Sequence, residues 1–391
     1  SNSPNLLNGT FLGTGSNGQG WYDLCIAVSP ENAETVLVGG VNFWKSVNGG
    51  ANWTRLTYWY SGTGTPAVHA DQHYIYSLPN TDTLYIGNDG GVYRTPNFGT
   101  DWEWIGNDMA ITQFYRIGVS ATNPELILAG AQDNSSWAVN DGNWVELEAT
   151  GDGMEQLVNY EDSDILYTSS YNGNVARSTN GGNSFSDWLY SNKVGGESGD
   201  WITPYTQDPI NPNIFYAGFQ NVWKSTNGGS DWFAISGGFP GNTITILELC
   251  PTNPNYIYSG TDNWLRRTTD GGSNWNEINL PFYGNLSSVA IHQFDGNKIW
   301  ITRSGFEPNS KVYYSNNGGA SWNNVSEQLP NMPVNYVLYQ KNSPDRLYIA
   351  TDLGVFYRDL TTDSWVNYTY QLPNVVVSEL EINYSVGKLF A

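Results

Sequence analysis

The segment VHADQH at residues 68–73 combines two imidazoles and a carboxylate at alternate positions. On a β-strand, His69, Asp71 and His73 would point to one face. Such a trio could bind a divalent metal ion. It could equally form a hydrogen-bond network between sheets without metal, or contact a ligand. The residues leave these three interpretations open.

Acidic and aromatic residues recur in the segments that separate the expected strands. Exposed rings can stack on sugar faces and carboxylates can accept hydrogen bonds from hydroxyls, so the pattern predicts a ligand-binding surface. The alternative is that the Asp side chains bond backbone amides in tight glycine turns. The predicted ligand-binding residues are Tyr58, Trp59, Tyr60, His69, Asp71, His73, Asp89, Asp133, Asp152, Trp201, Asp262 and Trp264. Three further acids, Glu155, Asp200 and Asp352, fall in equivalent segments.

Catalysis by these acids would be glycoside hydrolysis, which needs two carboxyl groups across the scissile bond. The candidates are Asp71, Asp89, Asp133 and Asp152. The sequence has no P-loop, G-x-S-x-G, H-E-x-x-H or C-x-x-C motif. No cofactor is therefore predicted, although calcium is possible because Asp and backbone oxygens often hold it in acidic β-repeat proteins.

A repeated octapeptide must position these residues. STNGGSDW at 225–232 has near-copies at 46–53, 178–185, 268–275 and 315–322. Its Asn or Asp can start a turn, its glycines permit positive φ, and its aromatic residue can pack between sheets. The residues expected to have these structural roles are Asn48, Gly50, Trp53, Asn180, Gly182, Asn227, Gly229, Trp232, Asp270, Gly272, Trp275, Asn317, Gly319 and Trp322. Degraded copies at 95–102, 139–144 and 359–365 predict different turns.

The closing aromatic residues stand 41 to 49 residues apart, and each interval contains four short β-rich segments. This period predicts an all-β protein, a single β-propeller of four-stranded blades. Eight units occupy residues 22–375 and a ninth begins at 376–391. Residues 1–21 would be the end of a preceding blade or of a blade shared by the two termini. Turns between strands one and two and between three and four lie at one end of a blade, so functional loops are expected at the opposite end.

Composition narrows the functional classes. The chain has 16 basic and 37 acidic residues, a formal net charge of −21, which argues against nucleic acid and an anionic membrane surface. No apolar run approaches the roughly 20 residues that span a bilayer. Cys25 and Cys250 lie at different places in different units, so we expect no disulfide. The composition suits a secreted protein, with an acidic cytosolic protein as the alternative.

The octapeptide resembles the Asp-box (BNR) repeat of sialidases, sortilin-type VPS10 receptors and xyloglucan-degrading propellers. Longer stretches resemble a group of large secreted bacterial proteins with VPS10-like propellers, often exported by the type IX system. These stretches are GQGWYDLCIAVSP (18–30), VHADQH (68–73), GNDGGVYRT (87–95), AGAQDNSSW (129–137) and GDGM (151–154). The resemblance implies a cell-surface or extracellular location and further domains in the same polypeptide.

Two functional hypotheses follow. The first is a binding, adhesion or scaffold module for a glycan, a protein or a peptide; the alternative is a glycoside hydrolase. Sialidases hold their substrate with an arginine triad, whereas most arginines here directly precede the octapeptides, at the other end of the blades. Xyloglucanases with this repeat place their acids between two tandem propellers, and only one ring is legible in the sequence.

Overall fold

The structure, a computed structural model, describes residues 4–107, 109–147, 151–238, 242–362, 364–369 and 372–391. The chain forms two compact units, residues 1–112 and 113–391. Residues 1–3 of the predicted head segment lie outside the described residues.

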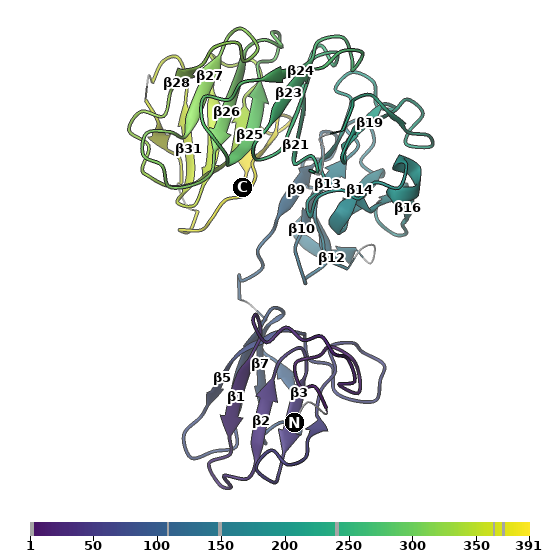
Figure 1. Cartoon of the computed structure of the whole chain (residues 1–391), viewed down its shortest axis with the longest axis vertical. Coiled ribbons are helices and arrows are strands. Elements are labelled where there is room, and N and C mark those ends of the chain that lie inside the picture. Colours follow the sequence, from purple (N-terminus) through teal and green to yellow (C-terminus); the bar gives the residue numbers. More distant parts are fainter. Residues whose placement is uncertain (1–3, 108, 148–150, 239–241, 363, 370–371) are drawn as a thin grey trace. The chain divides into compact units, whose positions relative to one another are not determined.

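The first unit contains two four-stranded antiparallel sheets, each an up-and-down meander (Figure 1). The strands of the first sheet are β1 (Cys25–Val28), β2 (Val36–Gly39), β3 (Phe43–Ser46) and β4 (Thr54–Arg55). Those of the second are β5 (Gln72–Ser77), β6 (Leu84–Asn88), β7 (Gly91–Thr95) and β8 (Glu103–Trp104). The two sheets pack through one apolar cluster that includes Leu37, Phe43, Leu84 and Ile86.

The second unit contains six further four-stranded sheets and one two-stranded sheet among its described residues. The first three are β9 (Arg116–Val119), β10 (Ile127–Gly130), β11 (Ser136–Asn140), β12 (Asn143–Leu147); β13 (Gln156–Val158), β14 (Leu166–Ser169), β15 (Val175–Ser178), β16 (Ser186–Leu189); and β17 (Tyr205–Gln207), β18 (Phe215–Gly218), β19 (Val222–Ser225), β20 (Phe233–Ala234). The next three are β21 (Ile246–Leu249), β22 (Ile257–Gly260), β23 (Leu265–Thr268), β24 (Asn276–Ile278); β25 (Leu286–Ile291), β26 (Ile299–Arg303), β27 (Val312–Ser315), β28 (Asn323–Asn324); and β29 (Val334–Tyr339), β30 (Leu347–Thr351), β31 (Gly354–Arg358), β32 (Val366–Asn367). The last pair is β33 (Glu381–Asn383) and β34 (Lys388–Phe390), and two 3-10 turns, η1 (Tyr171–Gly173) and η2 (Ser191–Val194), lie in links.

The octapeptide forms the same hydrogen-bonded turn in each intact copy. In one copy the Ser225 hydroxyl accepts the Gly229 N–H at 2.9 Å, and the Asn227 carboxamide accepts the Asp231 N–H at 3.0 Å. Gly228 and Gly229 have φ of 70° and 83°, the left-handed region that glycine adopts without a steric clash. The predicted structural role of the octapeptide therefore agrees with the observed turn.

The octapeptide turns share one end of each sheet with the turns between strands one and two. The N–H of Gly49 donates to the Glu34 carbonyl at 2.9 Å, and that of Gly228 to the Asn213 carbonyl at 2.8 Å. We call this end the octapeptide face. The opposite end, which carries the links between strands two and three and between successive sheets, is called the loop face.

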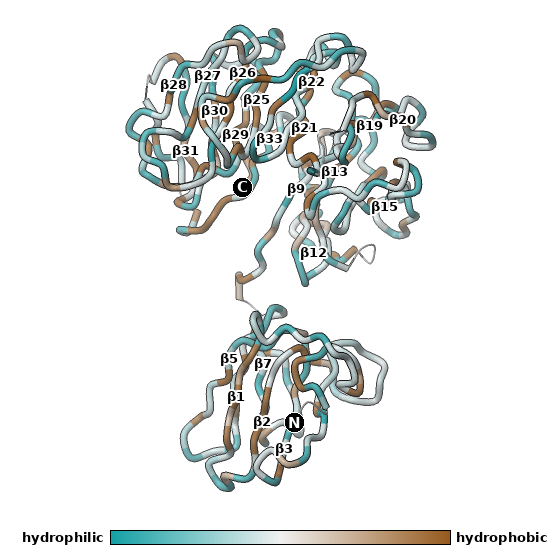
Figure 2. Tube along the Cα trace, in the orientation of Figure 1, coloured by the Kyte–Doolittle hydropathy of each residue, from teal (hydrophilic) through white to brown (hydrophobic). Residues whose placement is uncertain are grey.

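Neighbouring sheets of the second unit pack through apolar clusters between their faces, and hydrophobic stretches follow strands such as β25 (Figure 2). The ring closes where β33 lies beside β9, and the Asn383 carboxamide donates to the Ser120 carbonyl at 3.0 Å. The other face of the last pair buries Leu380 against Ala350 and Val355. The predicted propeller fold is confirmed by these sheets.

Residues 4–21 form bends over the first sheet, where Phe11 stacks on the Arg55 guanidinium. The degraded copy at 139–144 forms a tight hairpin in which Asp141 and Gly142 both have positive φ, a turn that differs from that of the intact copies. Among the described residues no helix has the length and apolarity to cross a membrane, and both cysteines are buried thiols.

Candidate functional site

The VHADQH segment does not form the continuous strand that alternation requires. Strand β5 begins at Gln72, and Asp71 before it has φ of 66°, a left-handed conformation that Asp tolerates. His73 then occupies a β-bulge, where the pairing with β6 shifts register between Gln72 and Tyr74. A bulge re-aims a side chain, so the expected common face of His69, Asp71 and His73 is not formed.

His73 instead pairs with Asp89, which lies in the turn between β6 and β7. Its Nε2 atom is 2.6 Å from Oδ1 of Asp89, whose Oδ2 accepts the Tyr22 hydroxyl at 2.7 Å. The ring of Tyr22 also meets the His73 imidazole edge to face, with centroids 4.9 Å apart. Asp89 is therefore held by two side chains from separate segments of the first unit.

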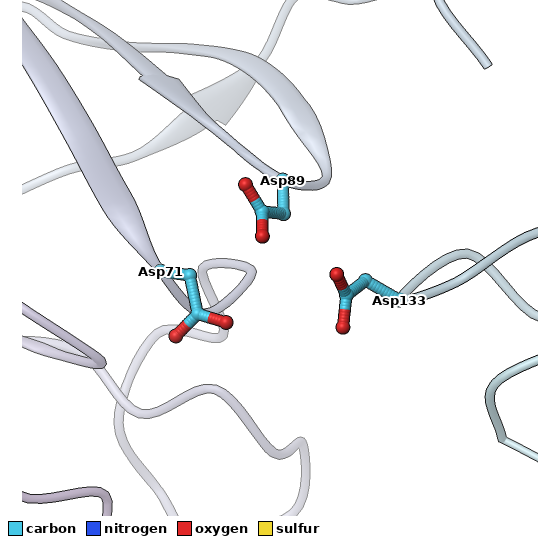
Figure 3. A group of neighbouring side chains, drawn as sticks. All are labelled: Asp71, Asp89 and Asp133. Carbon is cyan, nitrogen blue, oxygen red and sulfur yellow. The ribbon is translucent and has the colours of Figure 1, made fainter. Parts of the chain in front are cut away.

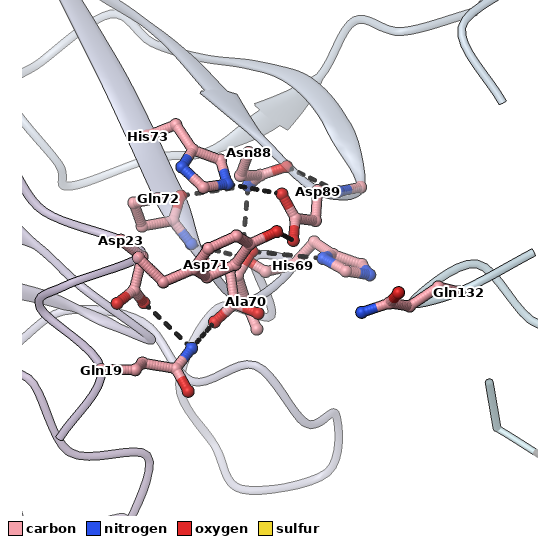
Figure 4. A network of polar contacts seen from close by, with 12 residues as sticks. Gln19, Asp23, His69, Ala70, Asp71, Gln72, His73, Asn88, Asp89 and Gln132 are labelled. Carbon is pink, nitrogen blue, oxygen red and sulfur yellow. Dashed lines mark hydrogen bonds and ion pairs between the residues drawn. The ribbon is translucent and has the colours of Figure 1, made fainter. Parts of the chain in front are cut away.

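Asp71 lies in a second acidic group with Asp23 and Gln19 (Figure 4). The Gln19 carboxamide donates to both carboxylates, at 3.3 Å for Asp23. Burial raises the pKa of Asp71 to about 6, and the charges of Asp23 and Asp89 add to this effect. Burial also raises the pKa of Asp23, which is fully buried and close to Asp71. The two acids thus favour a state in which they share a proton.

A buried amide network fixes the backbone around these acids. The fully buried Gln72 donates from Nε2 to the His69 carbonyl and accepts the Asn88 carboxamide at 3.1 Å. Gly90 lies against the His69 ring so closely that a Cβ there would be 2.3 Å from His69 Cγ. The turn at residues 88–91 therefore packs closely against His69, and Gly90 leaves the space that the imidazole ring occupies.

Among the described residues, His69, Asp71 and His73 do not bring their ligand atoms together around one point, so they do not form the predicted metal site. Asp71 and Asp89, drawn in Figure 3, and Asp23 supply the oxygen ligands that calcium prefers. Calcium at these acids stays a prediction. Asp133, drawn in the same figure, belongs to the second unit.

The predicted aromatic residues of the first unit lie apart from these acids. Tyr58 packs edge to face on Phe11, with centroids 5.1 Å apart, and Trp59 donates its indole N–H to the Gly9 carbonyl at 3.2 Å. Tyr60 is exposed. These rings therefore contact the segment that precedes β1.

Several predicted acids of the second unit accept hydrogen bonds from residues around them. Asp152 accepts the Asp133 N–H at 2.9 Å, and Asp262 accepts the Asn263 carboxamide at 2.7 Å. Asp200 accepts the Trp201 N–H at 2.8 Å. Asp352 accepts the Asn335 carboxamide at 3.0 Å. The contacts of Asp152 and Asp200 are with backbone amides, as in the alternative interpretation, whereas those of Asp262 and Asp352 are with side-chain carboxamides.

Exposed aromatic rings gather on the loop face of the second unit. Trp201 stacks on Tyr171, with centroids 5.2 Å apart and planes 7° from parallel, and both rings remain about two-fifths exposed. Trp264, Tyr283 and Phe306 are also exposed, and each lies in a loop-face link. Such rings are available to a ligand or a partner.

A cavity of about 300 Å³ lies among the first strands of the sheets, at the axis of the ring. Its charged lining contains four carboxyl groups and two bases: Glu155, Glu248, Glu379, Glu381, Arg116 and Lys341. Arg116 Nε lies 3.4 Å from Glu155 and 3.6 Å from Glu379, and Glu379 also accepts the Ile117 N–H at 2.6 Å. Lys341 lies over the Tyr384 ring, 5.5 Å from its centroid.

Excess carboxyl groups in this cavity hold protons near neutral pH. Burial raises the pKa of Glu248 to about 8, with the charges of Glu381 and Glu155 adding to it. Burial likewise raises the pKa of Glu155 and Glu381 to about 7 and that of Glu379 well above its usual range. Ionising a carboxyl group here costs free energy because burial removes its hydration. The two bases also compensate only part of the charge of four acids.

Sequence reasoning missed Gln19, Asp23 and Glu248. Gln19 and Asp23 lie in GQGWYDL, within one of the stretches that carry the family resemblance, but neither the repeat nor an alternating pattern marks them. Glu248 stands inside the apolar strand ITILELC, and a lone acid in such a strand is the signal that could have found it. Glu155 was named as a loop-face acid, and it reaches the cavity.

Part of the second unit matches a known protein family. Residues 220–364, less than half of the chain, match the family described as Sortilin, neurotensin receptor 3 (Sortilin-Vps10). No curated protein matches the chain. The sheets and their repeated octapeptide turns form a β-propeller, and the Sortilin-Vps10 match covers part of it.

One solved structure supports the propeller fold, and two GH74 structures are similar over most of this chain at low TM-scores. YCF48 from Cyanidioschyzon merolae is 14% identical with a TM-score of 0.53, over 69% of this chain and 90% of that one. A GH74 xyloglucanase from Xanthomonas campestris is 15% identical with a TM-score of 0.28, over 87% of this chain and 63% of that one. A GH74 enzyme from Niastella koreensis is 16% identical with a TM-score of 0.28, over 91% and 69%. At these identities the likeness concerns the fold alone.

Proposed function

We propose that the chain is a binding module whose second unit takes a protein or peptide ligand on the loop face. A basic side chain of the ligand would enter the cavity at the ring axis. The observation that supports this most is the excess of carboxyl groups in the cavity lining, four against Arg116 and Lys341. A lysine or arginine would pair with the carboxylates that form when these groups lose their protons.

The raised pKa values link this binding to protons. A bound cation favours ionised glutamates, so binding would release protons that Glu155, Glu248 and Glu381 hold near neutral pH. Affinity for a basic ligand is therefore expected to rise with pH from about 5 to about 8. Trp201, Tyr171 and Trp264 would contact the rest of the ligand through their exposed rings.

The test uses a fluorescein-labelled peptide with several lysines and a matched peptide in which glutamine replaces each lysine. Anisotropy titrations should detect binding of the lysine peptide alone. Glu248→Gln should weaken it by about tenfold, close to 1.4 kcal/mol. Glu277→Gln, the same change at an exposed acid on β24, is the control. Equal binding of both peptides, or no effect of Glu248→Gln, would contradict the proposal.

Glycoside hydrolysis is the second candidate, favoured by the protonated glutamates. A carboxyl group with a pKa of about 7 or 8 can act as a general acid at neutral pH. A glycan array read together with release of reducing sugar separates the candidates. Sugar release that Glu248→Gln abolishes would replace the binding proposal with hydrolysis, and glycan binding without release would assign the rings to a sugar ligand.

An extracellular or cell-surface location, with export by the type IX system and further domains in the polypeptide, is proposed alongside this function. It is supported by the net charge of −21 and by the resemblance of the longer sequence stretches. Fractionation of the producing cells, followed by immunodetection of the chain, tests the location.

A further inference from the structure

The two bases that line the cavity at the ring axis differ in how they contact its acids. Arg116 Nε lies 3.4 Å from a carboxylate oxygen of Glu155 and 3.6 Å from one of Glu379, and the Arg116 side chain is only 22% exposed. Lys341 lines the same cavity, but among the described residues its ammonium group makes no ion pair. It lies over the Tyr384 ring instead, and Lys341 as a residue is exposed. The acids of this cavity therefore hold a guanidinium and not the ammonium group.

The hydration of the two cations explains this difference. An ammonium group is a compact and strongly hydrated charge, whereas a guanidinium is planar, delocalised and more weakly hydrated, so the loss of water costs it less. Burial alone would lower the pKa of Arg116, but the charges of Glu379 and Glu155 raise it. Desolvation by the surrounding protein lowers the pKa of Lys341, although the charge of Glu381 acts in the opposite direction. The same cavity thus stabilises a charged guanidinium and disfavours a charged ammonium group.

Glu248 on β21 is a carboxyl group of this lining for which the described residues provide no base. It makes no ion pair with them, and the charges that act on it come from Glu381 and Glu155. Tyr336 on β29 lies close by, since Glu248 comes first among the charges that act on its hydroxyl group. That hydroxyl group has no hydrogen-bond partner in the part of the chain that the structure describes. A carboxyl group and a phenol oxygen are thus both available to a donor that enters the cavity.

We propose that the basic side chain that enters the cavity is an arginine, and that its guanidinium pairs with Glu248. This inference rests on the proposed function and names the residue that the site selects. The planar guanidinium presents a pair of N–H donors to one carboxylate and a further donor to the Tyr336 hydroxyl oxygen. A lysine ammonium group can also reach Glu248, but it loses more hydration and therefore binds with lower affinity.

The test compares three fluorescein-labelled peptides that share the sequence Gly-Ser-X-Gly-Ser-X-Gly-Ser, in which X is arginine, lysine or citrulline. Citrulline keeps the shape of arginine without its charge. Anisotropy titrations of the whole chain are made at pH 8 and physiological ionic strength. The affinity for the arginine peptide should be at least about tenfold higher than that for the lysine peptide. The citrulline peptide should bind more weakly than the arginine peptide by a larger factor.

Two variants test whether Glu248 and Tyr336 cause this preference. Glu248→Gln keeps the size of the side chain and should reduce the ratio of the arginine to the lysine affinity to about twofold or less. Tyr336→Phe removes only the hydroxyl group, so it should weaken the arginine peptide by about threefold and the lysine peptide less. Glu277→Gln, at an exposed acid on β24, is the control and should leave the ratio unchanged. Thermal unfolding of each variant verifies that it folds.

The outcomes separate this inference from the proposed function. Equal affinities for the arginine and lysine peptides, or a higher affinity for lysine, with both above the citrulline peptide, would overturn the inference and leave the proposed function standing. Equal binding of all three peptides, or binding of none, would refute both. A preference for arginine that persists in Glu248→Gln would overturn the pairing with Glu248.

Discussion

Nε2 of His73 lies 2.6 Å from Oδ1 of Asp89, and the β-bulge at His73 accompanies this contact. On a regular strand the imidazole would share a face with Asp71 instead. In the first unit Asp89 thus bonds His73 and Tyr22, whereas the nearby Asp71 bonds Gln19, which also donates to Asp23.

Asp71→Asn should remove a pH dependence of the first unit. The folded pKa of Asp71, about 6, lies above its usual value of 3.8. The folded state therefore keeps a proton that the unfolded chain has lost, and stability falls as pH rises from about 4 to about 6. Asn cannot ionise and tolerates the positive φ at this position. Hydrogen exchange of β5 and β6 at pH 4.5 and 7 should differ less in the variant. Asp82→Asn is the control, and an unchanged difference in Asp71→Asn would contradict the assignment.

Gly90→Ala should destabilise the first unit by about 1–3 kcal/mol, because the added Cβ would overlap the His69 ring at 2.3 Å. Gly87→Ala in β6 is a matched control, since nothing lies within 4 Å of its added Cβ. Urea denaturation followed by tryptophan fluorescence measures both. Equal urea midpoints for the two variants would show that the His69 ring can move to accommodate a side chain at residue 90.

Ser225→Ala should cost about 1–3 kcal/mol in the second unit. The buried Gly229 N–H loses the hydroxyl that it bonds at 2.9 Å, and an unsatisfied buried donor carries its desolvation cost. Ser230→Ala, in the same turn but exposed, should change little. Thermal unfolding of both variants compares them, and a loss of similar size in Ser230→Ala would refute the specific role of Ser225.

Trp275→Phe should lower stability by about 1 kcal/mol or more, because the indole bond to the Ile235 carbonyl at 2.7 Å is lost while an aromatic ring remains. Trp264→Phe, at an exposed loop-face residue, is the control. Chemical denaturation should show the loss at Trp275 alone. Equal stability of the two variants would mean that packing between neighbouring sheets does not depend on this hydrogen bond.

The sequence by itself determined the repeat and its turns. The Ser, Asn and paired Gly of each octapeptide act within eight residues, so their hydrogen bonds and positive φ angles follow from local chemistry. It also determined which links carry acids and rings, because antiparallel strands of known order place their connections at one end or the other.

Only the tertiary structure decided which side chains meet. The bulge at His73, the approach of Asp23 to Asp71, and the cavity lined by Glu248, Glu379 and Glu381 all depend on residues from separate segments of the chain. Ring closure by β33 against β9 likewise depends on the number of sheets and the twist between them. No local pattern encodes these contacts, since each is fixed by packing between elements far apart in the chain.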